Sequence, residues 1–262
     1  MKKLLLLAVC CFTLGNVNAQ SEYKRWMKTE QKESTYSTKE IKKAAKEYME
    51  MIYEEAKDGD IMKDRRDFLK KKIKKREDII LDEYARRTQD YKIKRYKVAD
   101  NLPSLEVQVK TDVRMEYSYE DDLFPTNIPG EAKSLSKTYE LATSKAYDMA
   151  RENIANEIIH EIMLQFINKD FVKRFGAVKS QEMVQAILDS KAGILNRLGD
   201  YEKVLELYNS KNTVSSEVIV KVYYNGIQAK EDFKMALKEV LKNDEALYNE
   251  MTYFLDTAKG KK

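Results

Sequence analysis

Cysteine is almost missing from this chain. Its 262 residues include two, Cys10 and Cys11, and both lie in the apolar segment near the N-terminus. If that segment is removed during export, the mature protein carries no thiol. Disulfides, thiolate metal sites, redox dithiols and cysteine nucleophiles are then excluded, and an exported domain must be stabilised by packing.

Glycine, proline and histidine are scarce as well, with 8, 3 and 1 residues. No GxxxxGK[ST], GxGxxG or GxSxG motif occurs, which argues against a glycine-rich phosphate cradle and against a nucleophile elbow. Charged residues make up 35% and apolar ones 43% of the chain. Few turn residues in such a composition predict long helices, and not a many-stranded barrel or sandwich.

No apolar run is long enough to span a bilayer. The N-terminus is instead typical of a secretory signal: Lys2 and Lys3 precede an apolar run over 4–14, and "VNAQ" offers small residues before a cut after Ala19. We therefore expect residues 1–19 to be a cleaved signal peptide. The alternatives are a retained anchor or a buried core helix.

A lipoprotein signal is the nearer rival, because two cysteines end the first part of the apolar run. Lipid attachment needs a small residue directly before the cysteine, and Val9 and Cys10 occupy those positions. We expect an exported protein, periplasmic or associated with the outer membrane, that is not lipidated.

The net charge gives no general argument for a polyanionic partner. The formal charge of +4 falls by two when Lys2 and Lys3 are removed, and export also argues against nucleic acid. Locally, residues 61–100 hold 15 Lys+Arg against 8 Asp+Glu. The sharpest part is the run KKKIKKR, whose basic members are Lys70, Lys71, Lys72, Lys74, Lys75 and Arg76.

This basic run is a candidate contact for anionic lipid headgroups, lipopolysaccharide or peptidoglycan. The other interpretation is a solvated helix whose charge is balanced by neighbouring acids. A helix is the expected carrier in both cases.

Apolar periodicity divides the mature chain into an arm, a helical region and a domain. Residues 20–37 are polar and without a clear period, and we interpret them as a flexible arm. Apolar residues three or four apart then predict a helical, basic region over 38–100, with helices over about 38–58 and 60–89. An α+β domain is expected over 101–258.

Alternation of apolar and polar residues predicts the strands. It is strict over 105–119, which we interpret as a half-buried strand, and shorter strands are expected over 91–98, 201–208 and 216–225. The stretch 121–130 holds two of the three prolines and is expected to be a loop. Segregated helices and strands indicate an α+β fold with a small antiparallel sheet covered on one side.

Three helices are expected in the domain, over about 136–168, 180–198 and 228–255. The first has an apolar line in steps of four, small in its N-terminal half and large in its C-terminal half: Ala142, Ala146, Ala150, Ile154, Ile158, Ile162 and Phe166. Small residues let a backbone approach its neighbour closely. We therefore expect this helix to be a scaffold element that lies on a sheet or a crossing helix.

Three blocks carry a family resemblance: PGEAKSLSKTYELATSKAYDMARENIANEI (129–158), SKAGILNRLGDYEKVLELY (190–208) and EVIVKVYYN (217–225). Their order is a G-x-A entry, an alanine-rich helix that turns apolar, a short second helix and two strands ending in YN. This pattern resembles the domain of the twenty-kilodalton bacterial outer-membrane lipoprotein family and is similar to secreted proteins of Gram-negative gut anaerobes that carry it. The resemblance covers about 129–240 and implies an α+β envelope protein with no assigned catalytic residues.

His160 is the one residue that invites a catalytic interpretation. Glu157 and Glu161 are its neighbours on the helix, and ExxH spacing recurs in di-iron bundles, but such a site needs a second histidine. A zinc site of His160 with carboxylates, or an enzyme using them, stays open as a weaker alternative. We predict no catalytic residues, no metal and no cofactor, and a structural role for His160.

The function we expect is non-enzymatic protein–protein association in the cell envelope, as a structural or assembly role with an envelope protein or a second copy as partner. An exposed edge strand would permit strand addition. The 17 tyrosines, among them Tyr117, Tyr119, Tyr223 and Tyr224, suit either a contact surface with wet hydroxyls or ordinary half-buried strands. The alternative function is peripheral binding to anionic lipid or cell-wall polymer through the basic helix 60–89.

Overall fold

A three-stranded antiparallel sheet organises the computed structural model, which describes residues 67, 71, 75–119, 124–166, 174–212 and 215–257. The chain forms two compact units, one of 1–61 with 167–185 and one of 62–166 with 186–262. All that follows concerns the second unit, apart from helix α9, which lies mostly in the first. The predicted signal peptide, the arm and the helix over 38–58 lie outside the described residues.

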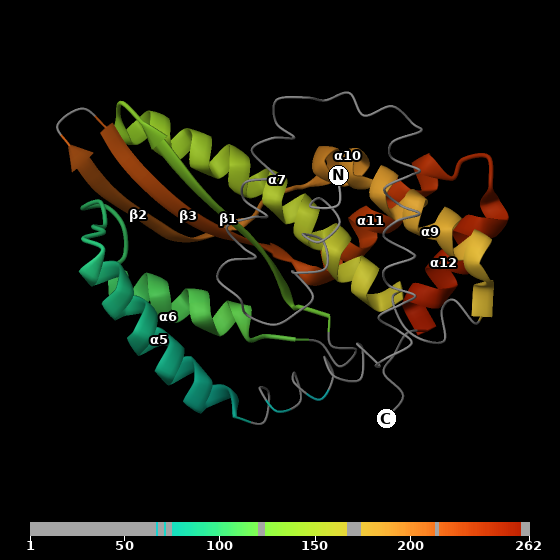
Figure 1. Ribbon diagram of the computed structural model, residues 1–262, viewed down its shortest axis with the longest axis horizontal. Coiled ribbons are helices and arrows are strands. Elements are labelled where there is room, and N and C mark those ends of the chain that lie inside the picture. Colours follow the sequence, from blue (N-terminus) through green and yellow to red (C-terminus); the bar gives the residue numbers. More distant parts are fainter. Residues whose placement is uncertain are drawn as a thin grey trace. The chain divides into compact units, whose positions relative to one another are not determined.

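The sheet has the order β1-β3-β2, with β3 pairing antiparallel to both neighbours (Figure 1). Its strands are β1 (Asn127–Ser136), β2 (Glu202–Asn212) and β3 (Ser215–Asn225). The described helices are α5 (Arg76–Ile93), α6 (Leu105–Glu116), α7 (Tyr139–Phe166), α9 (Ala177–Asp189), α10 (Lys191–Arg197), α11 (Gly226–Val240) and α12 (Glu245–Thr257). The predicted α+β class is confirmed, as are the two strands over 201–208 and 216–225.

Helix α7 lies on one face of the sheet, against β1 and β3 (Figure 1). Every residue of its predicted apolar line is buried, and its small half meets the sheet at Gly130. A Cβ added at Gly130 would lie 2.2 Å from the Ala150 carbonyl oxygen. Only glycine allows this approach of strand and helix, so the prediction of a scaffold helix lying on the sheet is confirmed.

Helices α5 and α6 lie on the opposite side, so the sheet is covered on both faces (Figure 1). The expectation of cover on one side was wrong because α6 was taken for a strand. Residues 105–116 of the predicted strand 105–119 form helix α6, which begins after Ser104, whose Oγ accepts a hydrogen bond from the Val107 N–H (3.4 Å). Its buried apolar residues fit both periods, since steps of four preserve alternation: Leu105, Val109, Val113 and Tyr117.

Two further expectations near α6 were wrong. The segment 91–98 is not a strand: it holds the end of α5 and one isolated bridge, from Lys97 to Tyr208. The predicted loop 121–130 contains the start of β1, where Pro129 is tolerated because β1 is an edge strand. Proline and glycine were read there as turn signals, whereas Gly130 serves the contact with α7.

The last two predicted helices are each interrupted. The span 180–198 divides at Ser190, whose hydroxyl donates to the Ile187 carbonyl (2.7 Å) and so competes with the helical backbone. The span 228–255 divides into α11 and α12, and Asp244 caps the second by accepting from the Leu247 N–H (3.0 Å). Among the described helices, none is long and apolar enough to cross a bilayer.

Candidate functional site

An ion network, buried at Asp112 and Lys221 and half-buried at Arg87 and Glu116, joins α5 and α6 to the central strand. We define it as Arg87 of α5, Asp112 and Glu116 of α6, and Lys221 of β3. The Lys221 ammonium lies 2.8 Å from oxygens of both Asp112 and Glu116. Arg87 binds Glu116 with both terminal nitrogens (2.8 and 2.9 Å) and reaches Asp112 at 2.9 Å. Each cation therefore bridges both carboxylates.

The helical period of α6 and the alternation of β3 together place three of these side chains side by side. Residues at steps of four along α6 put Asp112 and Glu116 on its inner face, beside the buried Val109 and Val113. On β3 the alternation turns Lys221 toward α6, while Val220 and Val222 face α7. The Tyr223 hydroxyl, two positions along, donates to an Asp112 carboxylate oxygen (2.8 Å).

Burial and the neighbouring charges shift the pKa values of three groups in and beside the network, Glu116, Lys221 and Tyr223. Burial opposes ionisation of Glu116, but Lys221 and Arg87 outweigh it and hold the pKa of Glu116 far below its usual range. Burial likewise opposes the charged form of Lys221, and the Glu116 carboxylate reverses this and raises the Lys221 pKa. Burial also raises the pKa of Tyr223. Proton-transfer catalysis needs pKa values near the working pH. All three shifts move the pKa values away from neutral pH.

The strand tyrosines are not a wet aromatic surface. Tyr117, Tyr223 and Tyr224 are buried. The Tyr224 hydroxyl donates to Asp232 (2.5 Å), and burial together with this acceptor raises its pKa to about 12. The contact surface of exposed hydroxyls that the composition suggested is therefore not formed by these three residues.

Neither edge of the sheet is a free template for another strand. The Gly226 N–H donates to the Thr126 carbonyl (2.8 Å), so by alternation the odd-numbered residues of β1 turn their backbone groups to the outer edge. There Pro129 has no N–H, and the Asn153 side chain donates to the Glu131 carbonyl (2.7 Å). These features discourage strand pairing.

The opposite edge, on β2, is covered by other parts of the unit. Tyr208 exchanges two backbone hydrogen bonds with Lys97 (2.8 and 2.9 Å), and the Gln108 side chain accepts from the Glu206 N–H (2.8 Å). Edge pairing is thus not the mode of association that the structure favours.

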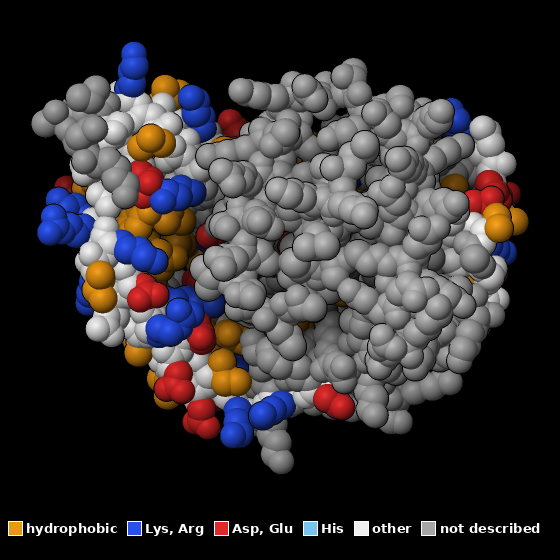
Figure 2. Space-filling model, viewed as in Figure 1, with side chains coloured by type: hydrophobic (Ala, Val, Ile, Leu, Met, Phe, Trp, Pro, Cys, Tyr) orange, Lys and Arg blue, Asp and Glu red, His pale blue; other side chains and the backbone are white. Residues whose placement is uncertain are grey.

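Half of the predicted basic run can be placed. Lys71, Lys75 and Arg76 are exposed and form no ion pair with any residue that the structure describes, whereas Lys70, Lys72 and Lys74 lie outside the described residues. The rest of α5 adds no unpaired positive charge among the described residues. Its further cations, Arg86, Arg87 and Lys92, form ion pairs with Glu83, Asp90, Glu106 and the ion network. On the face in Figure 2, acidic and basic side chains intermingle over the described surface.

His160 has acidic neighbours within reach, which the sequence interpretation had discounted. Ligand atoms of Glu157, His160 and Glu161 all lie within 4.8 Å of one another, and Glu161 is buried. Glu157 lies one turn of α7 before His160 and Glu161, and the three side chains could offer ligands to a divalent cation. They are the part of the described chain where a metal would find both imidazole and carboxylate.

An open groove runs along α11 on the surface beside α10. The two helices touch at small residues, since a Cβ added at Gly193 would lie 2.8 Å from the Ala236 Cβ. Two shallow hollows of about 480 and 540 Å³ adjoin along it and share Arg197. We call this surface the α10–α11 groove, lined by Arg197, Gly199, Asp200, Tyr224, Asn225, Ile227, Gln228, Met235, Lys238, Glu239 and Lys242.

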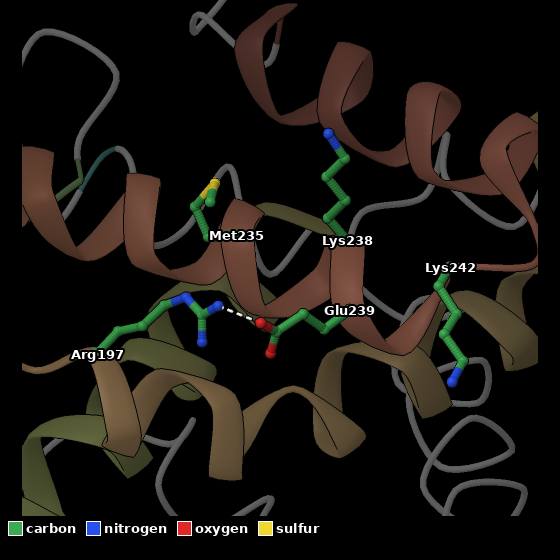
Figure 3. A pocket seen from close by; sticks show the side chains of 5 residues that line it. All are labelled: Arg197, Met235, Lys238, Glu239 and Lys242. Carbon is green, nitrogen blue, oxygen red and sulfur yellow. Dashed lines mark hydrogen bonds and ion pairs between the residues drawn. The ribbon is translucent and has the colours of Figure 1, made fainter.

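The groove combines exposed apolar groups with unpaired cations. Ile227 and Met235 are 62% and 53% exposed. Figure 3 shows Met235 and Lys238 extending from one side of α11, and Arg197 ion-paired with Glu239 on the other. Lys238 and Lys242 form no ion pair among the described residues. This arrangement can bind a partner that is both apolar and acidic.

Neither the groove nor the ion network was predicted from the sequence. Asp112 and Glu116 were assigned to the wet face of a strand, although Pro103-Ser104 is a helix-start signal that would have placed them together on α6. The groove depends on Gly193 and Ala236, which are distant in sequence and carry no motif. No family model, curated protein or solved structure matches this chain.

Proposed function

We propose that this protein is an exported component of the cell envelope that works by protein–protein association and has no catalytic activity, with the α10–α11 groove as its contact surface. The signal-like N-terminus and the resemblance over 129–240 support the location. The observation that carries the proposal is the exposure of Ile227 and Met235 beside Lys238 and Lys242, which have no ion partner among the residues that the structure describes. Exposed apolar groups rimmed by charge are typical of protein contact sites.

The ion network supports the non-catalytic part of the proposal. It is the most concentrated set of ionisable groups around β3, and its charges are held by mutual pairing. Such a set orders α5 and α6 on the sheet but offers no group poised to exchange a proton. Its role is therefore architectural.

Site-specific photo-cross-linking in the native envelope tests this proposal. A benzophenone amino acid replaces Met235 in the full chain, and Tyr253 on α12, which is 62% exposed, receives the same group as the matched control. We expect a discrete protein adduct from position 235, identified by mass spectrometry, and none from 253. A monodisperse monomer that yields no adduct at either position would contradict the proposal.

A second candidate function is peripheral binding to an anionic surface through the basic run. It is favoured by the exposure of Lys71, Lys75 and Arg76 without described ion partners. Flotation with vesicles of phosphatidylglycerol, at low and high salt, measures it. Retention that is lost in salt, and lost when the six basic residues of 70–76 become Gln, supports this function. Retention that the variant leaves unchanged removes it.

A further inference from the structure

We infer that the partner bound by the α10–α11 groove is an acidic amphipathic helix of another protein. The inference rests on the proposed function, because it names the chemistry of the partner at the same surface. Three features of the groove carry it: its length, its apolar positions and its unbalanced charge.

The length of the groove fits a helix. Its lining on α11 extends from Ile227 to Glu239, a helical distance of about 18 Å at 1.5 Å per residue, and Lys242 follows just after the helix end. A partner helix of about four turns would cover that distance. Helix-in-groove binding is a recurring mode of recognition, in which anchors recur three or four residues apart on one face.

The apolar residues of the groove set the spacing of the apolar side chains that a partner helix would need. Ile227 and Met235 lie eight residues apart on α11, so both point to the same side of the helix. They are about 12 Å apart along the axis, which matches apolar side chains two turns apart on a partner. Methionine is flexible and polarizable, so Met235 can adapt to anchors of different shape.

The charge selects an acidic partner. Among the five residues that line the first hollow, Arg197 and Glu239 neutralise each other. The ammonium groups of Lys238 and Lys242 remain without an ion partner in the described part of the chain. Carboxylates on the polar side of a bound helix would form ion pairs with these two ammonium groups. The same opposite charges would speed association at low ionic strength.

A protein helix fits this groove better than a lipid surface. The groove carries mixed charge, because Asp200 lines the second hollow while Lys238 and Lys242 line the first. A helix can place its acids opposite the two lysines and away from Asp200, whereas a uniform layer of anionic headgroups cannot. Peripheral membrane binding also gains about 1 kcal/mol per basic residue, so two unpaired lysines attract a membrane weakly.

The test uses a designed probe and the full mature chain. The probe is a fluorescein-labelled peptide of about 16 residues, with leucines three and four apart on one face and glutamates elsewhere. Binding is followed by fluorescence anisotropy. We expect saturable binding that weakens at least about tenfold for Met235→Glu, and likewise for the double change Lys238→Glu with Lys242→Glu. The control Tyr253→Glu should bind like the unchanged protein.

A charge exchange sharpens the test. A second peptide carries lysine in place of every glutamate, and we expect it to bind the double charge-reversal variant better than it binds the unchanged protein. A third peptide has the acidic composition in scrambled order, without an apolar face, and should bind at least about tenfold more weakly. Equal binding of all three peptides, or binding that no groove substitution alters, overturns the inference.

Two outcomes separate this inference from the function on which it rests. If the adduct at position 235 forms but the acidic helix does not bind, the partner chemistry is wrong and the association stands. If the protein binds phosphatidylglycerol vesicles and the groove variants abolish that binding, the partner is a membrane and the inference is overturned. Absence of any adduct contradicts the proposed function itself.

Discussion

The ion network and the α10–α11 groove both contain lysine and arginine, but the lysine of the network is buried and paired, whereas the lysines of the groove are exposed to solvent. In the network, Lys221 and Arg87 are each matched with two carboxylates, and the charges lie between a helix and a strand. In the groove, Lys238 and Lys242 lie in the open beside an exposed methionine. The number of basic groups is therefore a poor guide to function. What distinguishes the two regions is whether the chain already supplies the opposite charge.

The largest expected effect is the loss of Lys221. Changing Lys221→Met leaves Asp112 and Glu116 with one cation fewer in a buried position, which should lower the free energy of unfolding by about 3–5 kcal/mol. Urea denaturation measures the change. Lys238→Met in the groove is the matched control, and it should alter stability by no more than about 0.5 kcal/mol. Similar values for both variants would erase the distinction between the two regions.

A smaller loss is expected where strand and helix touch. Gly130→Ala places a Cβ 2.2 Å from the Ala150 carbonyl oxygen, and the resulting overpacking should cost about 1–3 kcal/mol. Gly199→Ala is the control, since its nearest neighbour would be the Tyr224 hydroxyl at 4.0 Å. Thermal unfolding of both variants should show a lower Tm for the first alone. An unchanged Tm for Gly130→Ala would mean that α7 does not approach β1 as described.

Acid should weaken the ion network. The pKa of Glu116 is held below its ordinary value of 4.5, so the folded state binds its proton less readily than the unfolded chain. Its stabilisation is complete above pH 4.5 and is lost as the pH falls below that value. Unfolding free energies measured from pH 7 down to acid should fall more steeply for the unchanged protein than for Glu116→Gln. Parallel curves would show that Glu116 is not paired in the fold.

The smallest effect on stability is expected in the groove itself. Met235→Glu changes an exposed side chain and should alter the free energy of unfolding by about 0.5 kcal/mol or less, while weakening the acidic probe peptide at least about tenfold. Denaturation and anisotropy on the same preparation measure the two quantities. A large stability loss in this variant would mean that Met235 belongs to the core and not to a contact surface.

A periodic apolar pattern predicted the right element where it was long, and it was ambiguous between helix and strand where it was short. The line from Ala142 to Phe166 spans six steps of four, a length of 25 residues that is typical of a helix and not of a strand, and the structure confirms helix α7 there. Over 105–119 the apolar residues at steps of four are also odd-numbered, so a helix produced the alternation of a strand. Only the capping residue Ser104 distinguishes the two, because it belongs to the start of a helix.

The candidate sites depend on contacts that periodicity does not encode. In the sequence, Lys221 is a single polar residue within an apolar strand. Its neighbours in the sequence give no sign of the two carboxylates of α6, which lie more than a hundred positions earlier. The same holds for Arg197 and Glu239, which meet only after α10 and α11 have packed at Gly193. Pairings of this kind follow from the topology of the chain, which the periodicity of single segments does not specify.

The sequence distance within the ion network bears on the order in which the protein is built. Glu116 precedes Lys221 by 105 residues, and Arg87 precedes Glu116 by 29. During synthesis or translocation α5 and α6 emerge together and can pair through Arg87, but their carboxylates wait for the last strand of the sheet. Contacts that close long loops form late. The α5–α6 layer is therefore expected to dock after the β2–β3 hairpin, so the contacts of Lys221 with Asp112 and Glu116 are expected to be among the last to form.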